Sequence, residues 1–189
     1  SHLIYISSDA VYSDIKTKIY ENSKTLPLNF HGMMHIIREG ILGKKFGKKI
    51  LIIRPTLIYG KHDNHNGYGP NKFLRLARKN KNIHLFGKGE ELRDHVYIET
   101  VVSAIIKCIL KKGVGKLNLA SGQVNSFNHI ARKIIKLTKS NSKIKFKKRN
   151  GIIPHNGYRP FNISLLKKKF GDIKIHNLKT GLKNYISLQ

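Results

Sequence analysis

Two uninterrupted apolar runs with a helical repeat between them constrain the fold of this sequence more than any other feature. Residues 3–6 and 50–53 are short and apolar throughout, which is typical of parallel strands buried on both faces. Between residues 30 and 42, apolar side chains recur at helical spacing, and Gly43 follows. A strand, a helix and a strand in this order form the βαβ unit of a doubly wound sheet, so the sequence predicts an α/β fold.

Outside this unit, the sequence predicts shorter elements separated by polar turns. Ser126 has a side chain suited to cap the amino end of a helix, and apolar periodicity predicts the other elements. The expected strands are residues 83–86, 117–119 and 143–148, and the expected helices are residues 72–79, 99–111, 127–137, 164–169 and 178–188.

The charge of the chain is strongly positive, with 37 Lys and Arg against 10 Asp and Glu and a formal net charge of +27. Such a charge suits nucleic acid, but most of it is Lys spread over the whole chain, so we do not expect nucleic acid as the main partner. No apolar stretch approaches the roughly 20 residues of a membrane helix, so no membrane span is expected. The single cysteine, Cys108, excludes an internal disulfide.

Four short motifs contain the residues that indicate a function. Residues 7–12 read Ser-Ser-Asp-Ala-Val-Tyr directly after the first predicted strand. Residues 27–39 read Pro-x-x-x-His-Gly-x-x-His-x-x-x-Glu, and residues 53–60 read Ile-Arg-Pro-Thr-Leu-Ile-Tyr-Gly. Residues 83–99 contain Phe-Gly-Lys-Gly followed by Arg-Asp-His-Val-Tyr. In their order and spacing these motifs resemble the NAD-dependent epimerase/dehydratase family of extended short-chain dehydrogenases, which modify nucleotide-activated sugars.

The resemblance implies a fold and a division of the chain. Residues 1–60 resemble the carboxyl-terminal half of a Rossmann-type parallel sheet, and residues 61–189 mainly a small mixed α/β substrate-binding region, interleaved with late Rossmann elements. The glycine-rich cofactor loop of the family does not occur, and the sequence opens within a predicted strand without Met, so we expect a fragment. The resemblance also implies a cytoplasmic enzyme, with a homodimer possible through the helix at residues 30–42.

The family's catalytic positions carry unusual residues here. By the resemblance, Ser8 binds the reacting sugar hydroxyl, and Asp9 matches the general acid of the 4,6-dehydratases. His31 and His35 replace the family's Tyr base and its supporting Lys. The expected catalytic residues are therefore Ser8, Asp9, His31 and His35, and the expected cofactor contacts are Ser7, His31, His35 and Pro55. The expected cofactor is NAD, with NADP left open.

An imidazole is chemically able to take the place of the phenol. Its free pKa of about 6.5 makes it a competent base near neutral pH. His31 and His35 lie four residues apart on one helix face, so two charged rings would repel and one is expected to titrate low. Two other interpretations stay open: a metal-binding His pair, for which no acidic third ligand is evident, and a site that binds without turnover.

The resemblance also assigns substrate contacts. Arg93 and Arg159 match the family's diphosphate-binding arginines, since a guanidinium binds phosphate with two parallel hydrogen bonds. Asn71, at a predicted helix start, matches a position that meets the diphosphate, and Phe86 is expected to line the nucleotide pocket. The expected partner is thus a nucleotide-sugar substrate, with a salt bridge from Arg93 to Glu91 or Asp94 as the alternative role of that arginine.

Overall fold

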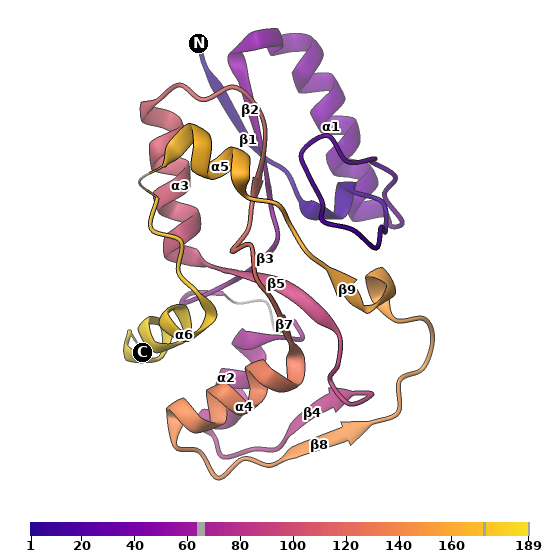
Figure 1. Cartoon of the computed structure of the whole chain (residues 1–189), viewed down its shortest axis with the longest axis vertical. Helices are drawn as coiled ribbons and strands as arrows, with labels where there is room; N and C mark the ends of the chain where they lie inside the picture. The colour runs from indigo at the N-terminus through magenta and orange to yellow at the C-terminus, as the bar shows by residue number, and fades with distance from the viewer. Residues whose placement is uncertain (64–66, 172, 189) are drawn as a thin grey trace.

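A three-stranded parallel sheet forms the first part of the structure, a computed structural model that describes residues 1–63, 67–171 and 173–188. Its strands β1 (Leu3–Ile6), β2 (Ile50–Pro55) and β6 (Gly115–Leu119) lie in the order β1-β2-β6. Helix α1 (Phe30–Phe46) covers one face, and α3 (Ile98–Leu110) and α5 (Ser164–Phe170) cover the other (Figure 1). The α/β fold with a parallel sheet is therefore confirmed.

The face toward α3 and α5 is the apolar core of this part. Leu51 and Ile53 of β2 and Leu117 of β6 are almost fully buried there against Cys108 and Phe170. Both neighbours of β2 supply backbone hydrogen bonds, and all six of its residues are buried, which explains its apolar run.

Helix α1 packs differently, because only two of its residues, Gly32 and Glu39, are buried. The helix begins where the Asn29 side chain accepts a hydrogen bond from the Gly32 backbone N–H at 2.8 Å. Several of its apolar side chains are exposed, Phe30 at 87% and Ile41 at 61%, whereas Ile36 packs against the cluster around Val11 and Tyr12. The periodicity thus predicted the helix, although the apolar stripe does not enter the core.

The second part is a mixed sheet surrounded by helices. Strand β5 (Leu92–Tyr97) pairs in parallel with β3 (Leu57–Tyr59) and β9 (Tyr158–Arg159) and antiparallel with β7 (Val124–Ser126). Strands β4 (Ile83–Phe86) and β8 (Ile144–Lys147) form a separate parallel pair. Helices α2 (Pro70–Arg78), α4 (Phe127–Thr138) and α6 (Leu178–Ser187) bury one continuous apolar cluster beside these sheets (Figure 1).

Most expected elements occur within a few residues of their predicted ends. The strand at residues 83–86 has the expected bounds, and Ser126 caps α4 by accepting a hydrogen bond from the His129 backbone N–H at 3.0 Å. The strands β3, β5, β7 and β9 were not expected. In β5 the buried residues include Arg93, Asp94 and His95, and such polar residues hide a buried strand from an apolar pattern.

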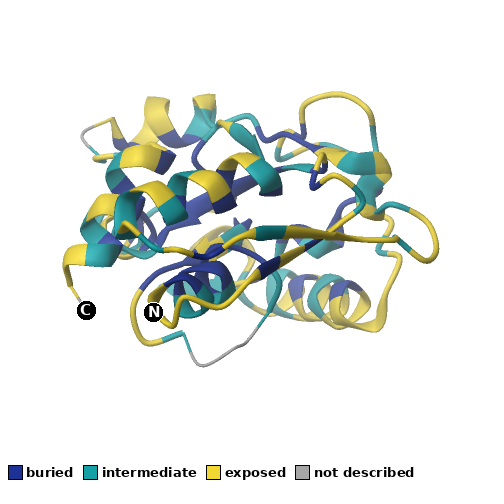
Figure 2. Ribbon diagram, turned by 90° about the horizontal axis from the view of Figure 1, so that it is seen from below, coloured by how far each residue is buried: buried dark blue, intermediate teal, exposed yellow. Residues whose placement is uncertain are grey.

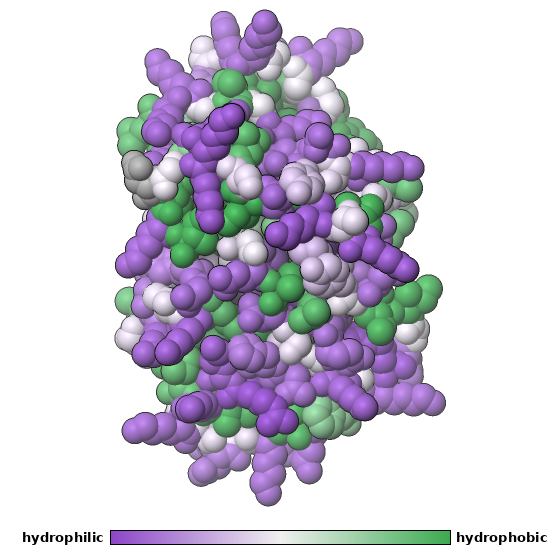
Figure 3. Space-filling view, in the orientation of Figure 1, coloured by the Kyte–Doolittle hydropathy of each residue, from purple (hydrophilic) through white to green (hydrophobic). Residues whose placement is uncertain are grey.

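The surface is mostly hydrophilic, as the many Lys and Arg residues of the sequence lead one to expect. Buried residues concentrate where sheets and helices meet (Figure 2), and hydrophilic side chains cover most of the face in Figure 3, with apolar side chains in separate patches. Among the described residues, no helix combines the length and the apolar character that crossing a membrane requires.

Candidate active site

The carboxyl end of β1 meets the start of α1 through a close backbone contact. After β1, Ser8 caps the 3-10 turn η1 (Asp9–Val11), and its hydroxyl accepts a hydrogen bond from the Ala10 backbone N–H at 3.1 Å. A Cβ on Gly32 would lie 2.2 Å from the Ala10 carbonyl oxygen, so only glycine allows this approach. The contact places His31, the neighbour of Gly32, beside the turn that carries Ser8 and Asp9.

We expect Gly32→Ala to lower the free energy of unfolding by about 1–3 kcal/mol, because the added methyl group forces α1 away from η1. Gly40→Ala on the same helix is the matched control. A Cβ at Gly40 meets nothing within 4 Å, so its better helix propensity should raise stability by up to about 1 kcal/mol. Urea denaturation measures the free energy of unfolding of both variants. An equal increase in both variants would contradict the close contact between Gly32 and Ala10.

The structure brings His31 and His35 together and adds a third residue, Tyr5. The two imidazole rings lie edge to face with centroids 4.6 Å apart, His31 exposed and His35 half-buried. The Tyr5 hydroxyl lies 2.8 Å from His35 Nδ1. Burial, and next the neighbouring His31, lowers the pKa of His35, as expected for one member of the pair. When Tyr5 donates to Nδ1, neutral His35 carries its proton on Nε2.

Behind these rings lies a buried ionic cluster that joins three motifs. Glu39 of α1 accepts two hydrogen bonds from the Arg54 guanidinium of β2, at 2.9 Å from Nε and 2.5 Å from Nη2. It also accepts one from the Ser7 hydroxyl at 2.6 Å. The Arg54 guanidinium stacks 4.7 Å from the Tyr12 ring centroid. Ser7 therefore supports α1 in this structure, and its expected cofactor contact stays a prediction.

Asp9 and Arg159 pair with each other although they lie 150 residues apart. Arg159 is 1% exposed and donates from Nε to Asp9 Oδ2 at 3.1 Å and from Nη1 to Asp14 Oδ1 at 3.0 Å. The pair links strand β9 to the turn after β1. The predicted roles of Asp9 as an acid and of Arg159 as a diphosphate clamp remain predictions, and each requires this ion pair to open.

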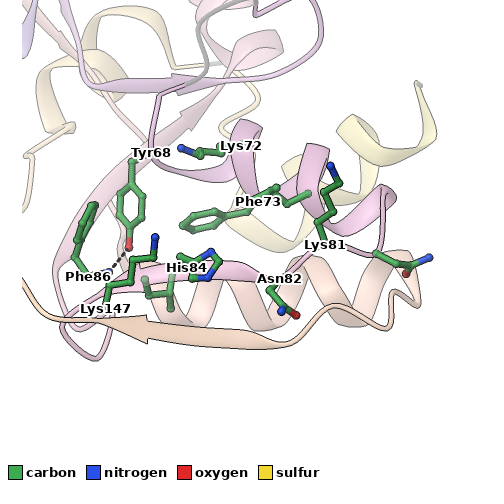
Figure 4. Close-up of a pocket in the computed structure, with 11 residues that line it drawn as sticks. Tyr68, Lys72, Phe73, Lys81, Asn82, His84, Phe86 and Lys147 are labelled. Atoms are coloured by element: carbon green, nitrogen blue, oxygen red, sulfur yellow. Dashed lines mark hydrogen bonds between the residues drawn. The ribbon is translucent and has the colours of Figure 1, made fainter.

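A cavity of about 580 Å³ lies between α2 and β4. Phe86 and Tyr68 line one end, and Tyr68 points toward the Phe86 backbone, whose N–H donates to the Tyr68 hydroxyl at 3.3 Å (Figure 4). Lys72, Lys81 and Lys147 also line it, and its described lining residues include no Asp or Glu. The cavity thus offers aromatic faces and positive charge, which suit a flat, anionic ligand.

Comparison with known proteins places these features in a family. The sequence model of the NAD dependent epimerase/dehydratase family matches residues 1–120, which include α1, β2, β5 and η1. The chain belongs to this family. The predicted resemblance is therefore confirmed.

The curated relatives are longer than this chain. A trifunctional UDP-glucose 4,6-dehydratase/UDP-4-keto-6-deoxy-D-glucose 3,5-epimerase/UDP-4-keto-L-rhamnose-reductase of Arabidopsis thaliana is 27% identical over 95% of this chain and 28% of its own length. The dTDP-D-glucose 4,6-dehydratase of Homo sapiens is 26% identical over 72% of this chain and 40% of its own length. The chain thus spans less than half of these relatives.

Solved structures of the family share the fold. The dTDP-glucose 4,6-dehydratase of Bacillus anthracis in complex with NAD superposes with a TM-score of 0.84 at 19% identity, over 98% of this chain and 60% of that one. The UDP-glucuronic acid 4-epimerase of Bacillus cereus in complex with UDP-glucuronic acid and NAD gives 0.82 at 21% identity, over 98% and 61%. Both confirm the Rossmann-like arrangement.

The family's Arg-Asp pair in β5 has two different environments. Arg93 Nη1 donates to Glu91 Oε1 at 3.0 Å, and Glu91 also meets Arg149, whose guanidinium lies 5.9 Å from the Phe86 ring centroid. Asp94 turns inward and accepts from the Ser121 backbone N–H and hydroxyl at 2.9 and 2.7 Å. Burial raises the pKa of Asp94 to about 6. Asp94 thus anchors a turn, whereas Arg93 borders the Phe86 region.

The two remaining predicted residues are Pro55, in β2, and Asn71, in α2. Pro55 ends β2 and is buried, and Asn71 starts α2 with its Oδ1 accepting from the Gly60 backbone N–H at 3.1 Å. Its amide nitrogen donates to Asp63. Residues 64–66 of the neighbouring polar loop lie outside the described part of the chain. Within that part, no three His, Cys, Asp or Glu side chains gather where they could hold a metal ion.

Two polar residues escaped the sequence analysis. Tyr5 lies within a run that predicts only a buried strand, and His95 lies within a strand that was not expected. A phenol two residues before Ser7 was the available signal for Tyr5, because strand residues alternate faces and Tyr5 shares its face with Ser7. Nothing in the sequence pattern distinguished His95.

Proposed function

We propose that the whole protein carries out NAD-dependent epimerisation, dehydration or reduction at a nucleotide-activated sugar. The observation that carries this proposal is the exposed His31 imidazole, which lies edge to face with His35 and beside the Ser8 turn through the Gly32 contact. Family membership supports the reaction class, and NAD occurs in the named complexes of related fold.

The residues present fit the nicotinamide end of a dinucleotide. Ligands of open parallel sheets bind at the carboxyl ends of the strands. His31 lies beside the turn that follows β1, His35 contacts Tyr5 of β1, and Pro55 ends β2. Bound NAD would supply hydride acceptance at a sugar carbon. His31 would take the proton of the sugar hydroxyl, which Ser8 orients. His35, held by Tyr5, would keep an N–H available to the cofactor ribose.

The nucleotide would occupy the cavity between α2 and β4. Phe86 is 45% exposed, so part of its ring is accessible for contact with a base. Lys72 and Lys147 would attract the diphosphate. Arg93 shares the Glu91 carboxylate with Arg149, whose guanidinium lies 5.9 Å from the Phe86 ring centroid. In this proposal residues 1–60 belong to the cofactor domain and residues 61–189 mainly to the substrate region.

The test is a spectroscopic assay on the whole protein with NAD and a panel of UDP-, dTDP- and GDP-sugars. With one sugar class we expect transient absorbance of reduced cofactor if the reaction is epimerisation or dehydration, because these two reactions begin by oxidising the sugar. If the reaction is a reduction, added NADH should instead be consumed. Binding of a nucleotide sugar without any reduction would instead favour a protein that binds but does not turn over.

That second function is favoured by one observation, the loss of both Tyr and Lys at positions 31 and 35. The variant His31→Tyr/His35→Lys separates the two functions. If the natural residues are inactive and this double variant reduces NAD, the natural protein is a nucleotide-sugar-binding pseudoenzyme. If the natural protein is the more active of the two, the imidazoles are a working catalytic pair.

We also propose a homodimer through α1 and a cytoplasmic location. The exposed apolar side chains of α1, including Phe30 and Ile37, form a face suited to a second copy. Sedimentation velocity on the whole protein tests the dimer, which a monomer at micromolar concentration would exclude.

A further inference from the structure

His95 is buried without a hydrogen-bonding partner. It lies in β5, is 4% exposed, and neither ring nitrogen has a partner among the described residues. Burial lowers the pKa of His95 to about 3, so the ring is neutral at physiological pH. A buried polar group without a partner is costly, and such groups in native proteins often mark ligand sites.

The ring lines a second cavity, of about 260 Å³, at the amino end of α2. Gly69 precedes the helix, and a Cβ placed there would lie 3.8 Å from His95 Nε2, so this nitrogen faces the helix start. Leu57 and Ile58 supply apolar walls, and Asn71 lines the cavity as well. The edge of the His95 ring against Phe127, with centroids 5.4 Å apart, keeps the imidazole in place.

Tyr68 joins this cavity to the larger one. It lines both, and its ring packs against Phe86 and Phe127 with centroids 5.3 and 4.6 Å away. A ligand with its base at Phe86 therefore has a small compartment next to it. The compartment is smaller than the roughly 300–1,000 Å³ of pockets for drug-sized ligands, so a single ring suits it.

We propose that His95 binds a hydroxyl group of the sugar ring in this second cavity and so helps to determine which sugar is accepted. A neutral imidazole has one donor and one acceptor nitrogen, and a hydroxyl group is likewise both donor and acceptor. The apolar walls suit the carbon face of a pyranose, and the uncapped helix start suits the adjoining phosphate. This inference rests on the proposed function, because it assumes a nucleotide-activated sugar.

The test compares nucleotide sugars with their free diphosphates. Calorimetry on the whole protein measures Kd for UDP-glucose, dTDP-glucose and GDP-mannose, each beside UDP, dTDP or GDP, in the natural protein and in His95→Phe. Phenylalanine keeps the packing on Phe127 but removes both nitrogens. We expect the sugar Kd to rise about 10-fold with the diphosphate Kd unchanged. The melting temperature of the unliganded variant should rise by about 2–4 °C.

His84→Phe is the matched control, because His84 lines the first cavity and should change sugar and diphosphate binding equally. An unchanged sugar-to-diphosphate ratio in His95→Phe would overturn the inference about His95 alone. If the natural protein binds no nucleotide sugar, the proposed function fails and this inference fails with it.

A second measurement covers the case in which His95→Phe does not fold. In the natural protein labelled with ¹⁵N at its histidines, the His95 ring signals should shift when the accepted nucleotide sugar is added and stay in place with the matching diphosphate. Equal shifts with both ligands would exclude a sugar contact.

Discussion

Glu39→Ala should lower the free energy of unfolding by about 3–5 kcal/mol, the largest stability effect that we expect from one substitution in this protein. Arg54 is fully buried, and Glu39 is 4% exposed. Removing the carboxylate leaves a buried guanidinium without its counter-charge and leaves the Ser7 hydroxyl without its acceptor. Burial opposes the charge of Arg54, whereas the hydrogen bonds to Glu39 raise its pKa, so the pair depends on both partners.

Urea denaturation followed by circular dichroism measures this loss. Arg38→Ala, an exposed neighbour on α1, is the control and should change stability by no more than about 0.5 kcal/mol. Glu39→Ala/Arg54→Met should recover part of the loss, because no charge is then buried alone. A loss below about 1 kcal/mol for Glu39→Ala would mean that water reaches Arg54.

His31→Ala should lower kcat/KM by about 100- to 10,000-fold, because the variant has no base beside the sugar hydroxyl. Binding of the nucleotide sugar should change much less, since His31 is not among the residues that line the cavities proposed to hold the rest of the ligand. His129→Ala, which removes an exposed imidazole from α4, should leave both quantities unchanged.

The pH profile gives a second readout of the same pair. A base must be neutral to accept a proton, so kcat/KM of the natural protein should fall on the acid side. Because the pKa of His35 is lowered, His35 stays neutral to lower pH than a free imidazole and does not itself limit the rate there. Activity that survives in His31→Ala with its acid limb intact would assign the base to another residue.

Residue spacing in the sequence predicted some contacts of this site and did not predict others. The spacing of Pro27, Gly32 and Glu39 resembles that of the family's catalytic helix, and the structure gives Gly32 and Glu39 structural roles in α1. Gly32 allows the close approach of α1 to Ala10, and Glu39 pairs with Arg54. The ion pair between Glu39 and Arg54 joins residues of two separate motifs, so neither motif alone predicted it. The Asp9–Arg159 pair spans 150 residues, and no local pattern reports such a contact.

The sequence by itself determined the βαβ unit and the family, and it predicted that His31 and His35 stand at the family's Tyr and Lys positions. These features depend on local periodicity and motif spacing, which are properties of neighbouring residues. Only the tertiary structure decided that Tyr5 holds His35, that Ser7 faces Glu39, and that His95 is buried without a partner. The physical reason is that hydrogen bonding and burial depend on which distant segments pack together. An apolar pattern did not predict β5, because half of its six residues, Arg93, Asp94 and His95, are polar although they are buried.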